Sequence, residues 1–160
     1  MLQGNFCFIS DQYYIDFPDP NVMINKEAVR GELRSRPCFF CFRDENEPRI
    51  LWLVPASTKY EKFKAIHDKK KAKYGFCNTI KLGTLIGRPA AFLIQNICPV
   101  TEKYIHEIYY DKNHQPIMIE EQLAKEIIRD SRSVLKLVRA GKPVTFTNVL
   151  GIYEALKKTL

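Results

Sequence analysis

Three adjacent polar residues, Ser57, Thr58 and Lys59, follow an apolar run and precede a lysine-rich segment. The apolar strand is expected to stop at Pro55, and Thr58 with Glu61 three residues later is typical of a capping box. This spacing predicts a helix with Thr58 as its N-cap. The N–H groups of a first helical turn, together with a lysine, form a suitable site for a phosphate group. We therefore expect an anion site where the strand ends and the helix begins.

Metal-free cleavage of RNA needs few protein groups, because the ribose 2′-hydroxyl is itself the nucleophile. The protein has to hold the phosphate, neutralise charge in the transition state and move protons. Ser57, Thr58 and Lys59 at a helix start would supply hydrogen-bond donors and a cation. In the alternative, structural interpretation, Thr58 or Ser57 only caps the helix and Lys59 is a surface lysine.

Metal and cofactor chemistry are not expected from this sequence. The acidic residues are dispersed, and His67, His106 and His114 fall in three different expected elements, none with a partner at ligand spacing. The seven glycines do not cluster into a phosphate-binding or dinucleotide-binding loop. A serine hydrolase is also disfavoured, because His67 would lie roughly 15 Å along a helix from Ser57. We expect no metal ion and no cofactor.

Lysines crowd the segment that follows Thr58. Seven lysines stand between positions 59 and 73, against two acidic residues. Steps of three and four residues put most of them on one helix face, with Phe63 and Ile66 toward the core. A one-sided basic stripe favours phosphate binding, and a merely solvated helix face is the alternative. The expected RNA-binding residues of this segment are Lys62, Lys64, His67, Lys69, Lys70, Lys71 and Lys73.

Arginines and tyrosines nearer the N-terminus extend this expected surface. Arg34 and Arg36 stand just before an aromatic strand and would add phosphate contacts. Tyr13 and Tyr14 follow the first expected strand, where they would either stack on an unpaired base or belong to the edge of the core. We expect Arg34, Arg36 and Tyr13 to contact RNA.

The chain of 160 residues carries a formal net charge of +7 and has a pI near 9.2. Its length suits one domain over residues 1–160, and its charge favours RNA, DNA or an anionic membrane surface as a partner. A membrane is disfavoured, because the basic helix lacks a wide aromatic and leucine face. No signal-peptide pattern opens the sequence, so a cytoplasmic protein is expected. The five cysteines are expected to be core thiols.

Hydrophobic periodicity predicts an α+β fold. Strand patterns occupy residues 5–9, 37–43, 49–54, 80–86, 89–97 and 103–110, which suggests a small barrel or a tightly curled antiparallel sheet. Apolar residues at three- and four-residue steps predict a long amphipathic helix over residues 117–140, stopped by Gly141. A shorter helix is expected to begin after Asn148 as its N-cap. Both helices are expected to pack on the sheet.

Four sequence blocks resemble the toxins of type III toxin–antitoxin systems, the ToxN, AbiQ and CptN group, and most closely the CptN branch. The blocks occur in the family's order and span nearly the whole chain. They are Phe8-Ile9-Ser10 leading to Tyr13-Tyr14-Ile15, then Arg36-Pro37, then Leu53-Val54-Pro55-Ala56-Ser57-Thr58-Lys59, and finally Leu137-Val138-Arg139-Ala140-Gly141-Lys142 followed by Thr147-Asn148.

This resemblance implies a compact, highly twisted antiparallel β-barrel with packed helices, similar to the Kid and MazF ribonucleases. It also implies metal-independent, sequence-selective cleavage of single-stranded RNA, by transesterification that leaves a 2′,3′-cyclic phosphate. The expected partners are the target RNA and an RNA pseudoknot antitoxin that the toxin cuts from a repeated precursor, in a closed protein–RNA hetero-oligomer. A role in phage resistance follows from the same resemblance. The competing interpretation is a non-catalytic basic RNA-binding module.

The family's hydroxyl-x-lysine segment corresponds to Ser57, Thr58 and Lys59, which the resemblance makes catalytic residues. Its early tyrosine corresponds to Tyr14, or to Tyr13 if the alignment slips by one. The family often has a proline between hydroxyl and lysine, and this chain has none, so the acting hydroxyl is either Ser57 or Thr58. A position that is aromatic in some members is Arg34 here.

Overall fold

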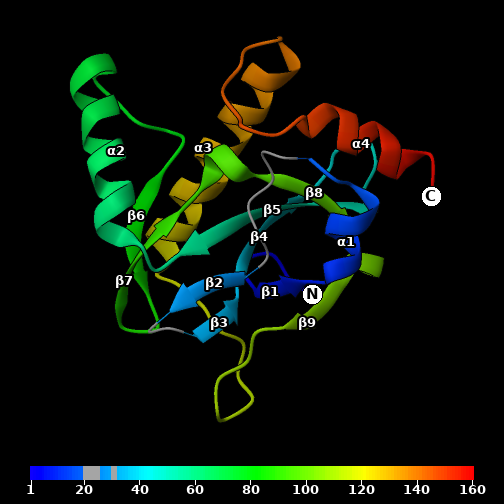
Figure 1. Cartoon of the computed structure of the whole chain (residues 1–160), viewed down its shortest axis with the longest axis horizontal. Coiled ribbons are helices and arrows are strands. Elements are labelled where there is room, and N and C mark those ends of the chain that lie inside the picture. Colours follow the sequence, from blue (N-terminus) through cyan, green and yellow to red (C-terminus); the bar gives the residue numbers. More distant parts are fainter. Residues whose placement is uncertain (20–25, 30–31) are drawn as a thin grey trace.

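The structure, a computed structural model, describes residues 1–19, 26–29 and 32–160, with side chains for 1–19 and 35–160. It is an α+β protein in which one mainly antiparallel sheet is covered by helices (Figure 1). Among the described residues, every helix is too short or too polar to cross a membrane.

Seven strands form the main sheet, in the order β6-β7-β5-β4-β1-β9, with β8 also paired to β5. The long strand β5 organises this sheet, because β4 pairs along one of its edges while β8 and then β7 pair along the other. The strands are β1 (Phe6–Ile9), β4 (Cys38–Arg43), β5 (Ile50–Ser57), β6 (Lys81–Leu85), β7 (Arg88–Phe92), β8 (Cys98–Thr101) and β9 (Ile105–Ile108).

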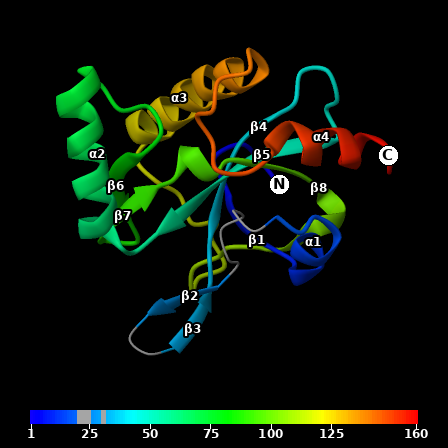
Figure 2. The same cartoon turned by 45° about the horizontal axis from the view of Figure 1, so that its top comes forward.

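The expected antiparallel sheet is confirmed, whereas the closed barrel is not. The path through the sheet ends at β6 on one side and at β9 on the other, and these two strands do not pair with each other. A separate two-stranded sheet is formed by β2 (Lys26–Val29) and β3 (Glu32–Ser35), which the sequence patterns did not predict. Figure 2 shows this hairpin projecting from the main sheet, on the side away from α3.

Strand β5 continues past Pro55, contrary to the expectation that it would stop there. Along one edge of β5, strand β8 pairs as far as Leu53 and strand β7 begins to pair at Ala56. Pro55 lies in the gap between these two neighbouring strands. Its missing N–H is therefore not needed on that edge, while its carbonyl accepts a hydrogen bond from the N–H of Leu93 at 2.9 Å. The strand expected over 89–97 is also different in the structure. β7 ends at Phe92, because the 3-10 helix η1 (Ile94–Asn96) follows it and separates it from β8.

In the described parts of the chain, four α-helices lie around the sheet, namely α1 (Asp11–Asp16), α2 (Tyr60–Tyr74), α3 (Glu121–Arg139) and α4 (Val149–Lys157). The long helix expected over residues 117–140 is confirmed as α3, although it begins four residues later, at Glu121; it buries Ile127 and Val134 and is followed by Gly141 with φ of 83°. The N-cap of α4 is also confirmed, since the Asn148 side chain accepts a hydrogen bond from the N–H of Gly151 at 3.0 Å. Figure 1 shows α2 standing beside β6 and β7.

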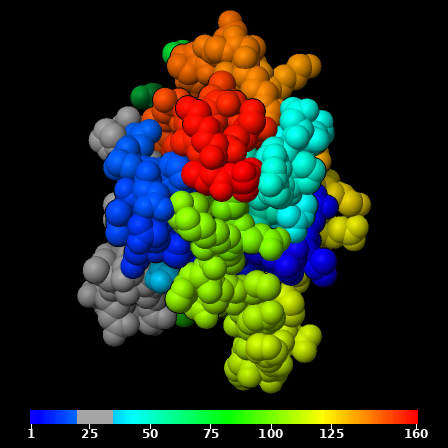
Figure 3. All heavy atoms as spheres, turned by 90° about the vertical axis from the view of Figure 1, so that its right-hand side faces the viewer, coloured from blue at the N-terminus to red at the C-terminus, as the bar shows by residue number. Residues whose placement is uncertain are grey.

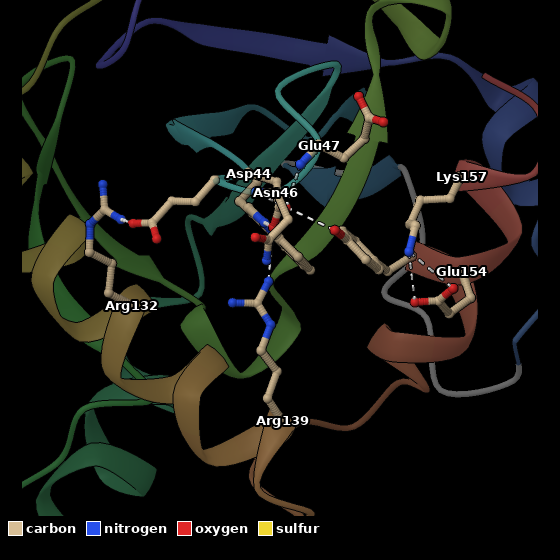
Figure 4. A network of polar contacts seen from close by, with 10 residues as sticks. Asp44, Asn46, Glu47, Arg132, Arg139, Glu154 and Lys157 are labelled. Carbon is tan, nitrogen blue, oxygen red and sulfur yellow. Dashed lines mark hydrogen bonds and ion pairs between the residues drawn. The ribbon is translucent and has the colours of Figure 1, made fainter.

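A buried carboxylate, Asp44 at the tip of the β4–β5 hairpin, joins three parts of the fold (Figure 4). Trp52 Nε1 donates to it at 2.9 Å, Tyr153 Oη of α4 at 2.8 Å and Arg139 Nη2 of α3 at 2.8 Å. The backbone N–H groups of Asn46 and Glu47 donate to it as well. Figure 3 shows α4, in red, on the surface between the segment of α1, in blue, and the β4–β5 hairpin, in cyan.

Burial raises the pKa of Asp44, but the hydrogen bonds from Trp52, from Tyr153 and from the two backbone N–H groups outweigh burial and hold that pKa below its usual range. Burial, and then the hydrogen bond to Asp44, raise the pKa of Tyr153 to about 12. At neutral pH the network therefore pairs a carboxylate with a neutral phenol and the Arg139 guanidinium.

The cysteines are free thiols, and three of them, Cys7, Cys38 and Cys41, are buried. Burial raises the pKa of Cys7 and of Cys41 to about 12. Protonated, buried thiols behave as small apolar side chains, which agrees with the expected core role for these three.

Replacing Asp44 with alanine is expected to lower the free energy of unfolding by at least about 2 kcal/mol, because the buried donors of Trp52 and Tyr153 lose their acceptor. Urea unfolding, followed by the fluorescence of Trp52, measures the loss. Glu45→Ala is the matched control, since it removes only an exposed ion pair with Arg132, and it should stay within about 0.5 kcal/mol of the parent. Equal losses in both variants would contradict the role given to Asp44.

Acid should remove the same stabilisation. Because the pKa of Asp44 is lower in the folded than in the unfolded chain, its contribution is complete above about pH 4 and disappears as the pH falls through the folded-state pKa. The parent should therefore lose stability below about pH 4 more steeply than Asp44→Ala. Parallel declines in the two proteins would show that other carboxylates dominate.

Candidate active site

The three adjacent polar residues of the expected site, Ser57, Thr58 and Lys59, lie where β5 ends. Ser57 is its last residue and is only 2% exposed, while Thr58 and Lys59 are exposed. The N–H of Lys59 donates a hydrogen bond to Ser57 Oγ at 3.1 Å, so the buried hydroxyl fixes the backbone at the lysine. The strand thus holds one hydroxyl inside the fold and presents the second hydroxyl and the ammonium to solvent.

The predicted capping box is wrong. Helix α2 begins at Tyr60, and its N-cap is Lys59, which makes no side-chain capping hydrogen bond. The cause is the extension of β5 to Ser57, which leaves Thr58 outside the helix and turns the Ser57 hydroxyl toward the Lys59 N–H. The expected helix is therefore present, but its N-cap lies one residue later, at Lys59 in place of Thr58.

An open hollow of about 510 Å³ lies beside this turn. Three basic residues line it, namely Lys59 at the N-cap of α2, Lys62 in its first turn and Arg88 at the start of β7, together with one acidic residue, Glu61. Arg88 was not among the expected site residues. It reaches the hollow because β7 pairs with the end of β5, with Ser57 opposite Ala91, and this long-range pairing leaves no signal around Arg88 in the sequence. The hollow can accept an anionic group next to Thr58.

A second, small cavity of about 20 Å³ lies next to Pro55, near the end of β5. Tyr14 and Arg36 line it, together with Pro55 of β5. Arg36 is only 7% exposed, and its Nη1 donates to the carbonyl of Ala56 at 3.5 Å. The structure therefore brings Tyr14 and Arg36, which are distant in the sequence, to the two residues that precede Ser57.

Tyr14 is a neutral phenol in this environment. Burial, and then the neighbouring Cys38 and Cys98, raise the pKa of Tyr14 far above its usual value, and Arg36 offsets only part of that effect. A phenol with so high a pKa can donate a hydrogen bond at neutral pH but does not ionise.

Two further polar residues line the same cavity, Asn96 of η1 and Thr147 of the segment before α4. Neither was among the expected site residues, although Thr147 belongs to one of the four resemblance blocks. Asn96 carries no motif that could have indicated it, because its position depends on the 3-10 helix between β7 and β8.

Tyr13 has a structural role. Its ring is 1% exposed, its hydroxyl donates to the carbonyl of Pro99 at 2.9 Å, and it packs edge-to-face on Tyr14 and Tyr104. A ring with so little exposed surface has no face for a base, so the expected stacking by Tyr13 does not fit this structure. Both Tyr13 and its neighbour Tyr14 line the small cavity, but the hydroxyl of Tyr13 is already bonded to the carbonyl of Pro99.

The lysines of α2 divide into two sets. Lys64 forms an ion pair with Asp68, which also contacts His67 at 3.0 Å, and Lys70 Nζ donates to Thr79 Oγ1 at 2.9 Å. The other expected residues are exposed along the helix, namely Lys59, Lys62, Lys69, Lys71 and Lys73. The expected face is therefore incomplete, because the Lys70 side chain turns toward Thr79 in the segment before β6. Phe63 is buried against Ile80 and Leu93, as predicted.

Arg34 lies in β3, but its side chain is outside the part that the structure describes. Among the described residues, histidines, cysteines and acids do not gather into any group of three or more that could hold a metal ion.

Comparison with known proteins finds no matching family model and no matching curated protein. Solved structures do match. ToxN, from a structure of a bacterial antiviral system regulated by a processed non-coding RNA, superimposes with a TM-score of 0.65 at 15% sequence identity, covering 94% of this chain and 95% of that chain. AbiQ, a lactococcal anti-phage endoribonuclease of the type III toxin–antitoxin system, gives a TM-score of 0.56 at 17% identity, covering 83% and 81%. The chain thus has the fold of these toxins.

Ser57→Ala is expected to speed hydrogen exchange at the Lys59 N–H by roughly 5-fold, because the amide loses one hydrogen bond worth about 1 kcal/mol. Native-state exchange followed by NMR measures the rate. Thr58→Ala keeps the Ser57 acceptor and should leave the rate unchanged. An unchanged rate in Ser57→Ala would mean that the turn does not depend on this hydroxyl.

Proposed function

We propose that this chain is an endoribonuclease toxin of the type III toxin–antitoxin class, nearest to the CptN branch, that cleaves RNA without a metal ion. The observation that carries the proposal is the end of β5, where Thr58 and Lys59, next to the buried Ser57, line a basic hollow that Arg88 also lines. The fold shared with ToxN and AbiQ supports the same class.

In the proposed reaction, the ribose 2′-oxygen attacks the adjacent phosphorus and the bond from phosphorus to the 5′-oxygen breaks. The 2′-hydroxyl gives up its proton, the leaving 5′-oxygen gains one, and the products are a 2′,3′-cyclic phosphate and a 5′-hydroxyl. Lys59 stabilises charge on the phosphate and assists proton transfer, while Ser57 or Thr58 hydrogen-bonds the non-bridging oxygens. Tyr14 contributes as a hydrogen-bond donor, consistent with its raised pKa, and Arg36 adds positive charge behind it.

The exposed lysines of α2 would bind the RNA backbone. In this proposal the same chain, acting as one domain over residues 1–160 in the cytoplasm, selects its target sequence, cuts its own repeat RNA and is inhibited by the resulting pseudoknot in a closed protein–RNA assembly. Cleavage of RNA in infected cells would give phage resistance, the property for which AbiQ is described.

A non-catalytic RNA-binding module is the second candidate. It is favoured by the exposed cations Lys69, Lys71 and Lys73, which would hold RNA whatever Lys59 does. Incubation of purified protein with single-stranded RNA in excess EDTA separates the candidates. Cleavage to cyclic phosphate ends supports the enzyme, and retention of intact RNA supports the binding module.

Lys59→Ala is expected to lower the cleavage rate by about 100- to 1,000-fold, because the variant lacks the cation that stabilises the transition state. Binding of intact RNA should persist, and the variant should be expressed without an antitoxin. Single-turnover cleavage measures the rate. The control is Lys125→Ala, an exposed lysine of α3 paired with Glu121, which should cleave like the parent. Undiminished cleavage by Lys59→Ala would remove this site from the mechanism.

Replacing Lys69, Lys71 and Lys73 with alanine should reduce the salt dependence of RNA binding. Each lost phosphate contact lowers the slope of log affinity against log salt concentration by about 0.7 for single-stranded RNA, so a decrease of about 2 is expected. A variant that loses Lys103, Lys112 and Lys125 has the same net charge and is the matched control. Equal slopes in the two triple variants would mean that α2 contributes only general charge.

A further inference from the structure

Two phenylalanines lie exposed on the surface outside the site described above. Phe76, just after α2, and Phe146, in the segment between α3 and α4, each keep 59% of their surface accessible. Exposing an aromatic ring to water forgoes the stabilisation that its burial would give. Figures 1 and 2 show the segments that follow α2 and α3 on the same upper side of the molecule.

A chain of hydrogen bonds links the backbone of Phe146 to a lysine side chain. The N–H of Phe146 donates to the carbonyl of Gln95 at 3.3 Å, and the N–H of Gln95 donates to the carbonyl of Thr79 at 2.9 Å. The hydroxyl of Thr79 in turn accepts from Lys70 Nζ at 2.9 Å. The ammonium that turned away from the lysine face of α2 is thus linked to the backbone of Phe146 through three hydrogen bonds, and Phe76 precedes Thr79 by three residues.

The same segment also borders the candidate active site. Thr147, the residue after Phe146, and Asn96, the residue after Gln95, both line the small cavity of Tyr14 and Arg36. An RNA strand with its cleaved phosphate at the end of β5 could therefore continue past this cavity to Phe146.

We propose that Phe146 and Phe76, with Lys70 beside them, form a subsite that stacks unpaired bases of single-stranded RNA next to the active site. Aromatic rings stack on any base, and lysines nearby neutralise the phosphates that link the bases. The charge of the surroundings favours RNA over an apolar protein surface, since Lys73 and Lys142 are also exposed at this side. The inference rests on the proposed function in that RNA is the ligand.

The test measures binding of short, unstructured RNA in the full-length Lys59→Ala protein, so that cleavage does not interfere. Phe146→Ala should weaken binding on the order of 10-fold, the effect of losing one stacked base. Phe146→Trp should restore it, whereas Phe146→Leu, which is apolar but has no aromatic face, should not. With an oligomer that lacks bases, all four proteins should bind equally.

The salt dependence separates stacking from charge. Phe146→Ala should keep the slope of the parent, because it removes no cation, while Lys70→Ala should lower the slope by about 0.7. Tyr110→Ala, which removes an aromatic ring from the loop between β9 and α3, is the matched control and should bind like the parent (Figure 1). Thermal unfolding of each variant excludes a folding defect.

Equal binding by Phe146→Ala and the parent, or an equal loss with the oligomer that lacks bases, would overturn the subsite. So would unchanged RNA binding combined with altered self-association in sedimentation, which would assign this surface to protein contacts. If the protein with Lys59 intact binds RNA through Phe146 but never cleaves it, the proposed ribonuclease function fails while the stacking subsite stands.

Discussion

The carboxylate of Asp44 fixes the geometry on which the site depends. Arg139, the last residue of α3, and Tyr153 of α4 both donate to it, so the segment between these helices is tied at both ends to the β4–β5 hairpin. That segment carries Thr147 into the cavity beside Tyr14. A buried carboxylate is stable only when hydrogen bonds replace its lost hydration, and the five donors to Asp44 meet that condition.

Two kinds of positive charge lie near the end of β5, namely the buried Arg36 and the exposed lysines of α2. Arg36 is almost fully buried and makes a direct contact with the carbonyl of Ala56, so its charge acts in surroundings of low polarity at a defined place. The exposed lysines of α2 are screened by salt over about 10 Å and act mainly on the approach and retention of a polyanion. In the proposed function, orientation of the phosphate and capture of the RNA strand would therefore fall to different elements.

The fold shared with ToxN and AbiQ at 15% and 17% identity shows how loosely the architecture constrains individual residues. A curled sheet and its covering helices need the right pattern of apolar residues more than particular side chains. Function therefore has to be argued from the site. Here that site is the junction of β5 with α2, where Ser57 fixes the backbone that presents Lys59.

The sequence by itself determined the features whose signals are local. Apolar periodicity located α3, the Asn148 side chain marked the start of α4, and the lysine run identified the basic helix. Tertiary structure decided the features that depend on pairing between distant segments. Pro55 stays within β5 because it falls between β8 and β7, Arg88 reaches the hollow through the β7 pairing, and Lys70 turns to Thr79. Hydrogen bonds to residues remote in the chain leave no periodic pattern, so these positions follow only from the folded sheet.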